Sequence, residues 1–245
     1  MDGSLKKALG THFGLSGLTV LNNAELASTS LIDINIKIWN LNTGSPKSIF
    51  VGLIISSIVT LKNGMLAIGL SNNNIRIYDP AGGNSIKELV GHTKPLTSLA
   101  IDINGALISG SLDNTIRIWD GNTYLFNGIL NEVSSPLYFS ILQNGYLAIG
   151  LSDNSIHIWD TNKVTLISDL TNAQFKALSS LALLLDGSLA SISTDESIKI
   201  WNTSDFKLIK TLKFTSPNTT SVLATLLNGD LACGIENRIQ TFTVV

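Results

Sequence analysis

Short runs of apolar residues alternate with pairs of turn-forming residues along the whole chain. Residues 66–78, LAIGLSNNNIRIY, are a clear example, in which two apolar runs flank a polar turn. Runs this short, rich in Ile and Leu and bounded by Asn, Asp or Gly, are typical of β-strands. Apolar positions do not recur at the spacing of a helix, so we expect an all-β chain.

The pattern repeats six times. The aromatic residues that close corresponding runs are Trp39, Tyr78, Trp119, Trp159, Trp201 and Phe242, and they lie 39 to 42 residues apart. The turn dipeptides that open the runs are Asn23-Ala24, Asn63-Gly64, Asn104-Gly105, Asn144-Gly145, Asp186-Gly187 and Asn228-Gly229. Since two independent markers keep one period, the chain contains six repeats of one structural unit.

Each repeat predicts four short antiparallel strands. The Asn-Gly and Asp-Gly pairs accept the positive φ angles of a type I′ turn, which predicts two-residue hairpin loops. A second turn, such as Asp113-Asn114, leads into an Ile-x-Ile-aromatic strand, and a fourth strand follows, as in residues 86–90. Four-stranded units of this length are the signature of β-propeller blades.

The two ends of the chain predict how the propeller closes. Residues 5–10, LKKALG, match the fourth strand of a repeat, whereas the sixth repeat stops just after its third strand. An N-terminal strand that completes the C-terminal blade would remove an exposed sheet edge. We therefore expect residues 1–245 to form a single domain, a closed monomeric β-propeller of six blades.

The third repeat resembles the WD-repeat family of β-propellers, and the resemblance extends over essentially the full chain. The segment that begins at Val90, VGHTKPLTSLAIDINGALISGSLDNTIRIWD, carries the Gly-His pair and the Trp-Asp dipeptide of that family. The resemblance implies a hydrogen-bonded tetrad of His92, Ser109, Asp113 and Trp119. Such a chain of donors and acceptors is satisfied even when it is buried.

The other repeats depart from the family pattern. Ile68, Ile149 and Cys233 replace the serine, and no second histidine matches His92. We therefore expect one complete tetrad, with apolar packing holding the other blades. His12 reads as a loop residue. His157 occupies the slot of Lys37, Arg76, Arg117 and Lys199, whose stems lie along a blade while their charges stay in water.

Composition and charge limit the kinds of partner and the cellular compartment that we expect. The 16 Lys and Arg residues against 18 Asp and Glu give a net charge of −2, which disfavours a nucleic-acid or membrane-surface role. The single cysteine, Cys233, has no partner for an intramolecular disulfide. The N-terminus lacks the apolar core of a signal peptide. We expect a cytoplasmic protein.

No constellation of catalytic residues stands out. Carboxylates recur at one place in the repeat, which indicates a structural role, since a catalytic pair occurs once: Asp33, Asp113, Asp153, Asp195 and Glu236. The three histidines lack zinc-ligand spacing, and there is no phosphate-binding glycine loop. We expect no enzymatic activity, no metal and no cofactor.

The resemblance implies a docking module that receives a protein or peptide on one face of the propeller. Apolar and basic residues in the loops of that face are candidates for the contact: Leu53, Ile54, Lys94, Pro136, Phe175, Lys176 and Phe214. Phe175 and Phe214 could instead tuck under their own loops. Two alternatives stay open: a purely structural or engineered propeller, alone or within a larger protein, and an enzyme or small-ligand binder at the central channel.

Overall fold

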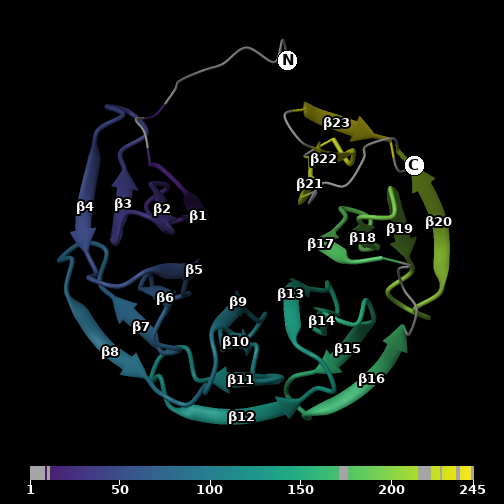
Figure 1. Cartoon of the computed structure of the whole chain (residues 1–245), viewed down its shortest axis with the longest axis horizontal. Coiled ribbons are helices and arrows are strands. Elements are labelled where there is room, and N and C mark those ends of the chain that lie inside the picture. The colour runs from purple at the N-terminus through teal and green to yellow at the C-terminus, as the bar shows by residue number, and fades with distance from the viewer. Residues whose placement is uncertain are drawn as a thin grey trace. The chain divides into compact units, whose positions relative to one another are not determined.

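The computed structural model describes residues 9, 12–170, 176–214, 222–226, 228–235 and 238–243. In those residues the chain forms twenty-three β-strands and no helix, as the apolar pattern predicts (Figure 1). The strands make five four-stranded sheets and one three-stranded sheet, in each of which neighbours in the chain are neighbours in the sheet. The all-β prediction and the antiparallel four-stranded unit are thus confirmed.

Contacts divide the chain into two compact units. The first comprises Met1–Asp113 and Arg117–Gly128, and the second comprises Asn114–Ile116 and Ile129–Val245, so the boundary crosses the third sheet.

The strands of sheet one are β1 (Leu15–Val20), β2 (Leu26–Ser30), β3 (Asn35–Trp39) and β4 (Pro46–Phe50). Those of sheet two are β5 (Ile55–Thr60), β6 (Leu66–Leu70), β7 (Ile75–Tyr78) and β8 (Ser85–Leu89). Those of sheet three are β9 (Leu96–Ile101), β10 (Leu107–Ser111), β11 (Thr115–Trp119) and β12 (Phe126–Asn131).

The second unit contains the remaining three sheets. Sheet four consists of β13 (Pro136–Ile141), β14 (Leu147–Leu151), β15 (Ile156–Asp160) and β16 (Thr165–Leu170). Sheet five consists of β17 (Leu178–Leu183), β18 (Leu189–Ser193), β19 (Ser197–Trp201) and β20 (Leu208–Lys213). Sheet six consists of β21 (Val222–Thr225), β22 (Leu231–Ile235) and β23 (Arg238–Phe242). The strand expected from residues 5–10 to complete sheet six lies, except for residue 9, outside the described residues.

The hairpin loops between first and second strands differ from the expected two-residue type. In sheet two the amide of Leu61 donates to the carbonyl of Met65, which encloses three loop residues. Gly64 has a φ of 86°, whereas Asn63 does not have a positive φ. A type I turn followed by one left-handed residue is the usual three-residue hairpin loop, and only its last position favours glycine. The type I′ prediction was wrong because it required both residues to have positive φ.

Inside the first unit, neighbouring sheets bury their apolar faces against each other. One cluster joins Ile36 and Ile38 of β3 to Ile55 and Ile68 of sheet two. A second joins Ile75 and Ile77 of β7 to Leu96, Leu107 and Trp119 of sheet three. The first strands also contact each other directly, and Thr19 Oγ1 lies 3.0 Å from Thr60 Oγ1. Removing these isoleucines and leucines from water is the main stabilising contribution to the stack.

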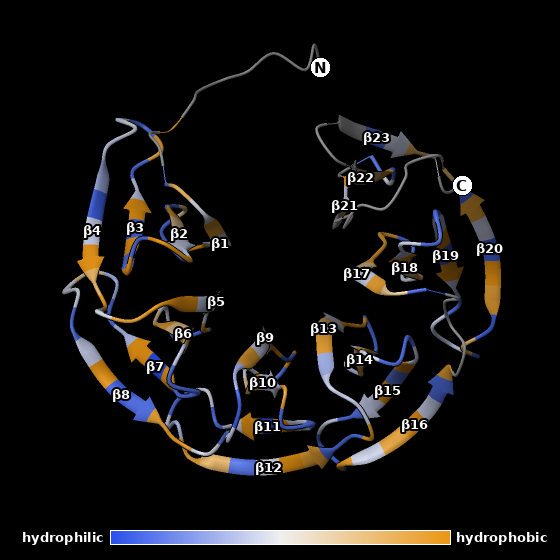
Figure 2. Cartoon of the chain, viewed as in Figure 1, coloured by the Kyte–Doolittle hydropathy of each residue, from blue (hydrophilic) through white to orange (hydrophobic). Residues whose placement is uncertain are grey.

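The second unit is built in the same way. Ile156 and Ile158 of sheet four pack against Leu178 and Leu181 of sheet five. Ile198 and other residues of sheet five pack in turn against sheet six. The fourth strands form the outer edge of each sheet and mix hydrophilic with hydrophobic residues, as β8 and β12 show (Figure 2). In both units, successive sheets therefore pack on each other through apolar side chains from corresponding strands of the repeat.

Candidate functional site

The best-formed polar cluster lies in sheet three. Trp119 on β11 donates its indole N–H to Ser109 Oγ on β10 at 2.9 Å. His92 Nε2 lies 2.9 Å from the same oxygen, and His92 Nδ1 lies 3.0 Å from Asp113 Oδ2. The amide of Thr93 also donates to this carboxylate, at 2.9 Å. The structure thus brings together the four residues that the family resemblance singled out.

The environment of His92 favours the neutral imidazole. Its side chain is almost completely buried, and this desolvation lowers the pKa of His92 below its ordinary value. Asp113 acts in the opposite direction but does not overcome the burial. A neutral ring donates from one nitrogen and accepts at the other, so it links an acceptor carboxylate to a hydroxyl. This cluster holds the connection before β9 to the sheet and leaves no reactive group exposed.

Sheet one contains a partial version of this cluster, in which the hydrogen bond between histidine and aspartate is missing, so it is not a second complete tetrad. Ser28 Oγ accepts the indole N–H of Trp39 at 2.7 Å and lies 2.7 Å from His12 Nδ1. His12 Nε2 lies 3.7 Å from Asp33 Oδ2. Burial and then the charge of Lys37 lower the pKa of His12. The His12 side chain is therefore buried beside Ser28, unlike the ordinary loop residue that we expected, but its Nε2 has no hydrogen-bond partner among the described residues.

A signal for this partial cluster was present in the chain. His12 follows Gly10 by two residues, whereas His92 follows Gly91 directly. One extra residue therefore hides the Gly-His motif, which requires adjacent residues. Ser28 and Trp39 take the serine and tryptophan positions of the third repeat, but they lie eleven residues apart, whereas Ser109 and Trp119 lie ten apart.

Sheet four satisfies its tryptophan through a carboxylate. Isoleucine replaces the tetrad serine at position 149, and Trp159 donates its indole N–H to Glu132 Oε1 at 2.7 Å. The other oxygen of Glu132 lies 2.7 Å from His157 Nδ1. The Glu132 side chain is only 2% exposed. Glu132 stands four residues before Pro136, the first residue of β13, just as His92 stands four residues before Leu96, the first residue of β9. Sequence patterns missed Glu132 because a glutamate takes the place of the histidine that marks this position.

His157 differs from the water-facing cation that its place in the repeat suggested. The residue is buried, and the hydrogen bond to Glu132 is the largest of the effects that raise the pKa of His157 above its usual value. Asp169 Oδ1, 3.5 Å from His157 Nε2, adds to this effect. Glu132, His157 and Trp159 therefore form an ion pair closed by an indole, in place of a neutral relay through serine.

The remaining sheets keep only parts of the pattern. In sheet five Trp201 donates to Ser191 Oγ at 2.9 Å. In sheet two Tyr78 takes the tryptophan position, and its hydroxyl lies 3.4 Å from Arg76 Nη1. In sheet six Cys233 is fully buried among apolar residues. The polar cluster thus differs from sheet to sheet, although the apolar faces are equivalent.

The candidate partner residues divide into exposed and buried groups. Ile54, Lys94 and Lys176 are exposed, each just before the first strand of its sheet. Leu53 is half-buried against the core between sheets one and two.

Two other candidates are corrected by their burial. Pro136 is buried at the start of β13. Phe214 is 8% exposed and its ring lies 6.5 Å from the ring of Phe242, so it belongs to the core between sheets five and six. Phe175 lies outside the described residues. The described partner candidates that remain accessible are Ile54, Lys94 and Lys176, with Leu53 partly so.

Comparison with known proteins adds the family. The family described as "WD domain, G-beta repeat" matches residues 83–120, which include His92, Ser109, Asp113 and Trp119. The chain is a WD-repeat protein.

Curated relatives match parts of this WD-repeat protein. "Ribosome biogenesis protein WDR12 homolog" of Anopheles gambiae is 30% identical over 43% of the chain and 26% of its own length. "U3 small nucleolar RNA-associated protein 21 homolog" of Schizosaccharomyces pombe is 31% identical over 56% of the chain and 16% of its own length. "Ribosome biogenesis protein YTM1" of Scheffersomyces stipitis is 38% identical over 37% of the chain and 21% of its own length. The chain therefore spans about a quarter or less of each of these relatives.

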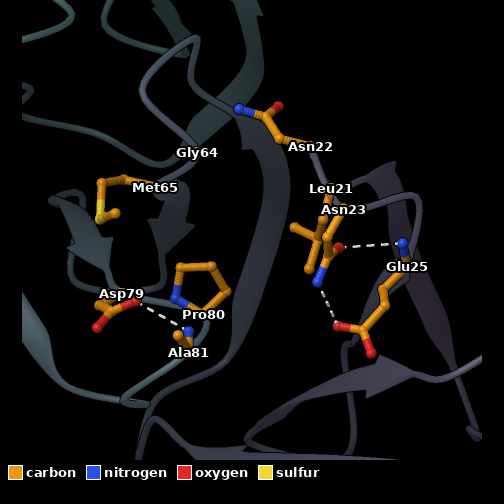
Figure 3. Close-up of a pocket in the computed structure, with 9 residues that line it drawn as sticks. All are labelled: Leu21, Asn22, Asn23, Glu25, Gly64, Met65, Asp79, Pro80 and Ala81. Atoms are coloured by element: carbon orange, nitrogen blue, oxygen red, sulfur yellow. Dashed lines mark hydrogen bonds between the residues drawn. The ribbon is translucent and has the colours of Figure 1, made fainter.

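The WD-repeat protein also has a pocket between the loops of sheets one and two, at the end of the first unit opposite to Lys94. It encloses about 260 Å³, and one wall is formed by Leu21, Asn23 and Glu25 (Figure 3). Met65 and the Asp79-Pro80-Ala81 turn line the facing side. The carboxylates already accept hydrogen bonds: Glu25 from the Asn23 side chain, and Asp79 from the amide of Ala81. The pocket is mainly apolar and its polar groups serve its own turns.

Within the described parts of the chain, no group of three or more His, Cys, Asp or Glu side chains is arranged to hold a metal ion. None of the described residues forms a helix long and apolar enough to cross a membrane.

Proposed function

We propose that this WD-repeat protein is a non-enzymatic docking module for a protein or peptide partner. The observation that carries the proposal is that accessible side chains lie in the loops just before the first strands of three sheets: Ile54 in sheet two, Lys94 in sheet three and Lys176 in sheet five. The polar residues in contrast, such as Ser109 and Asp113, satisfy one another. A surface of apolar and basic loop residues beside a satisfied interior is suited to binding.

The relatives support a role in assemblies. One further relative is "THO complex subunit 6 homolog" of Danio rerio, 29% identical over half of this chain, and its name places it in a complex. One of the matched proteins is named for its association with an RNA. For this chain, the expectations of no nucleic-acid partner, no membrane role and a cytoplasmic location stay predictions.

We also propose that the six sheets close into a single monomeric ring. In support, the first strand of sheet one leaves Leu15, Leu18 and Val20 about half exposed or more, whereas Ile55 and Ile58 on the equivalent strand of sheet two are buried. Three exposed apolar side chains on one strand form a patch of the kind that packs against another segment. Sheet six has three described strands, so a fourth strand from the N-terminal residues would complete it.

Substitution of Leu18 by Asp tests this closure. A covered Leu18 implies a loss of about 2 kcal/mol or more of unfolding free energy, because a charge would be buried. Leu208→Asp, at a similarly exposed leucine on the outer strand β20, is the matched control. Equal and small losses in both variants would contradict ring closure.

Capture of partners tests the docking role. Affinity capture with the double variant Ile54→Ala/Lys94→Ala should recover less of any partner than the unmodified chain does, while the thermal midpoint stays the same. Lys163→Ala/Lys207→Ala is the matched control, since these exposed lysines lie in loops at the opposite end of their sheets. If the two variants capture equal amounts of partner, the proposed docking face is wrong.

The absence of catalysis stays a prediction with its own test. A thermal-shift screen with divalent metals and sugars measures whether any small ligand binds the folded state. A strong and specific shift would favour the alternative of a ligand binder or enzyme.

A further inference from the structure

One side-chain position recurs on every described third strand, two residues before its aromatic. The residues at this position in the first five repeats are Lys37, Arg76, Arg117, His157 and Lys199. Three of these side chains lie close to a carboxylate in the same sheet or in the loop that leads into it. The pairs are Lys37 with Asp33 at 3.5 Å, Arg76 with Glu88 at 3.4 Å, and His157 with Glu132 at 2.7 Å. The fold thus normally supplies an anion for the cation at this position.

Arg117 in sheet three departs from that rule. Among the described residues, no carboxylate lies within 4.0 Å of its guanidinium. The outer strand of sheet two provides Glu88, but the corresponding strand β12, FNGILN, contains no acidic residue. The Nε–H of Arg117 is shielded from solvent and finds no acceptor in the described part of the chain. A partly desolvated cation without an anion is costly for the folded protein.

The surroundings of Arg117 hold its guanidinium in place. The ring centroid of Phe126 lies 5.3 Å from its central carbon, which is a cation–π contact. On another side the guanidinium approaches the backbone of Gly91 so closely that a Cβ there would lie 2.5 Å from Nη1. A side chain already fixed in this way loses little further entropy when it binds a ligand.

Apolar residues at the surface flank the same place. Phe126 is 52% exposed and Val90, the neighbour of Gly91, is 70% exposed. Both belong to the first unit, together with Arg117. A cation between two exposed apolar side chains matches a segment in which a carboxylate stands beside apolar residues. A polyanion instead gains its affinity from many cations spread along its length.

We propose that Arg117 receives a carboxylate side chain of a docking peptide, while Val90 and Phe126 contact the apolar neighbours of that carboxylate. The inference rests on the proposed docking function and names the chemistry of the partner. A carboxylate can accept two parallel hydrogen bonds from a guanidinium, which is the strongest neutralisation that a peptide offers. The partner would supply the acid that Glu88 supplies to Arg76 in sheet two.

A pair of short peptides tests the proposal on the full chain. The probes are acetyl-Leu-Glu-Leu-amide and acetyl-Leu-Gln-Leu-amide, added to isotope-labelled protein while the Nε–H signal of Arg117 is followed by NMR. The Nε–H signal that is absent from the spectrum of Arg117→Lys is assigned to Arg117. We expect the Glu peptide to shift this signal, and the Gln peptide to leave it in place. Affinity for the Glu peptide should fall about tenfold in Arg117→Gln.

Arg76→Gln is the matched control, because its guanidinium already has an anion, and its affinity for the Glu peptide should equal that of the unmodified protein. Arg117→Lys keeps the charge but loses the two parallel hydrogen bonds of a guanidinium, so it should bind the Glu peptide with intermediate affinity. This variant replaces Arg117→Gln in the test if Arg117→Gln fails to fold. Equal affinity of the two peptides, or unchanged affinity in both Arg117 variants, overturns the proposal. Inorganic phosphate that shifts the signal at the same concentration as the Glu peptide also overturns it.

The failure of this inference is distinguishable from the failure of the docking role. If the Arg117 signal does not move while Ile54→Ala/Lys94→Ala still reduces capture, docking stands and the carboxylate site does not. If the Glu peptide shifts the signal but no partner is captured by any variant, the site stands and the broader docking role fails.

Discussion

Sheets three and four satisfy the same tryptophan in two different ways. In sheet three the Trp119 indole donates to a serine hydroxyl, and a neutral His92 continues the chain to Asp113. In sheet four the Trp159 indole donates directly to the carboxylate of Glu132, which also holds His157. The two arrangements bury the same donor but differ in charge. Equivalent backbones therefore accept either a neutral relay or an ion pair at one position.

The difference has consequences for stability. A neutral relay loses one or two hydrogen bonds when a member is removed, and each is worth about 1 kcal/mol net. A buried ion pair that loses one partner leaves a charge without compensation, which costs about 3 to 5 kcal/mol. Sheet four should therefore be the more sensitive of the two to a single deletion.

Removal of Glu132 should have the largest effect. In Glu132→Ala both the His157 imidazole and the Trp159 indole lose their buried acceptor, and we expect a loss of about 3 kcal/mol or more in unfolding free energy. Chemical denaturation measures it. Glu88→Ala is the control, because the pair of Glu88 with Arg76 is partly exposed and should contribute less than about 1 kcal/mol. Equal losses in the two variants would show that Glu132 is not effectively buried.

Removal of the relay serine should have a smaller effect. Ser109→Ala deprives both Trp119 and His92 of a partner, so we expect a loss of about 2 kcal/mol. Ser191→Ala in sheet five is the matched control, since Ser191 accepts the indole N–H of Trp201 at the corresponding position of its sheet. We expect the control to lose about half as much. A larger loss in the control would contradict a relay through Ser109.

The two histidines should give opposite responses to pH. The pKa of His157 is raised in the folded state, so its contribution is fully present below about pH 6.5 and is lost as the pH rises through the folded pKa. The pKa of His92 is lowered, so its contribution is present above about pH 6.5 and is lost as the pH falls through the folded pKa.

Unfolding free energies of the unmodified chain, His157→Gln and His92→Gln at several pH values between about 5 and 8 test these signs. The advantage of the unmodified chain over His157→Gln should shrink as the pH rises. Its advantage over His92→Gln should grow over the same range. Parallel curves for the two variants would remove the electrostatic distinction between the sheets.

Asp169 should contribute least. Its carboxylate lies 3.5 Å from His157 Nε2 but is 45% exposed, so water screens the interaction. We expect Asp169→Asn to cost less than about 1 kcal/mol, as measured by the same denaturation. If Asp169→Asn destabilises the chain as strongly as Glu132→Ala, then the outer carboxylate, and not the buried one, controls His157.

The repeat made most of the local structure predictable from the sequence. Trp119 and Ser109 share their spacing with Trp201 and Ser191, so the position of each indole and its acceptor follows from the period. The strands follow because runs such as residues 66–70 are short, apolar and bounded by turns. The loop type did not follow, since an Asn-Gly pair fits both two- and three-residue hairpins and hydrogen bonds to the flanking strands decide between them.

The polar clusters were harder to predict wherever a residue left its usual place or changed its type. His12 is displaced by one residue relative to its glycine, and Glu132 takes the place of the histidine, four residues before the first strand of its sheet. Only the three-dimensional contacts of Trp39 and Trp159 show the role of these two residues. Burial of Phe214 also depends on a neighbour, Phe242, that is distant in sequence.

Every sheet is made of strands that follow one another directly in the chain, and within each unit a sheet packs on its successor. Most loops that must close during folding are therefore short, so the entropic barrier to forming each sheet is small. During synthesis the ribosome would release one complete sheet about every forty residues. Each new sheet could then pack on the preceding sheet, which has already folded. Folding should then advance from the N-terminus in steps of one repeat, with the earliest amide protection in sheets one and two.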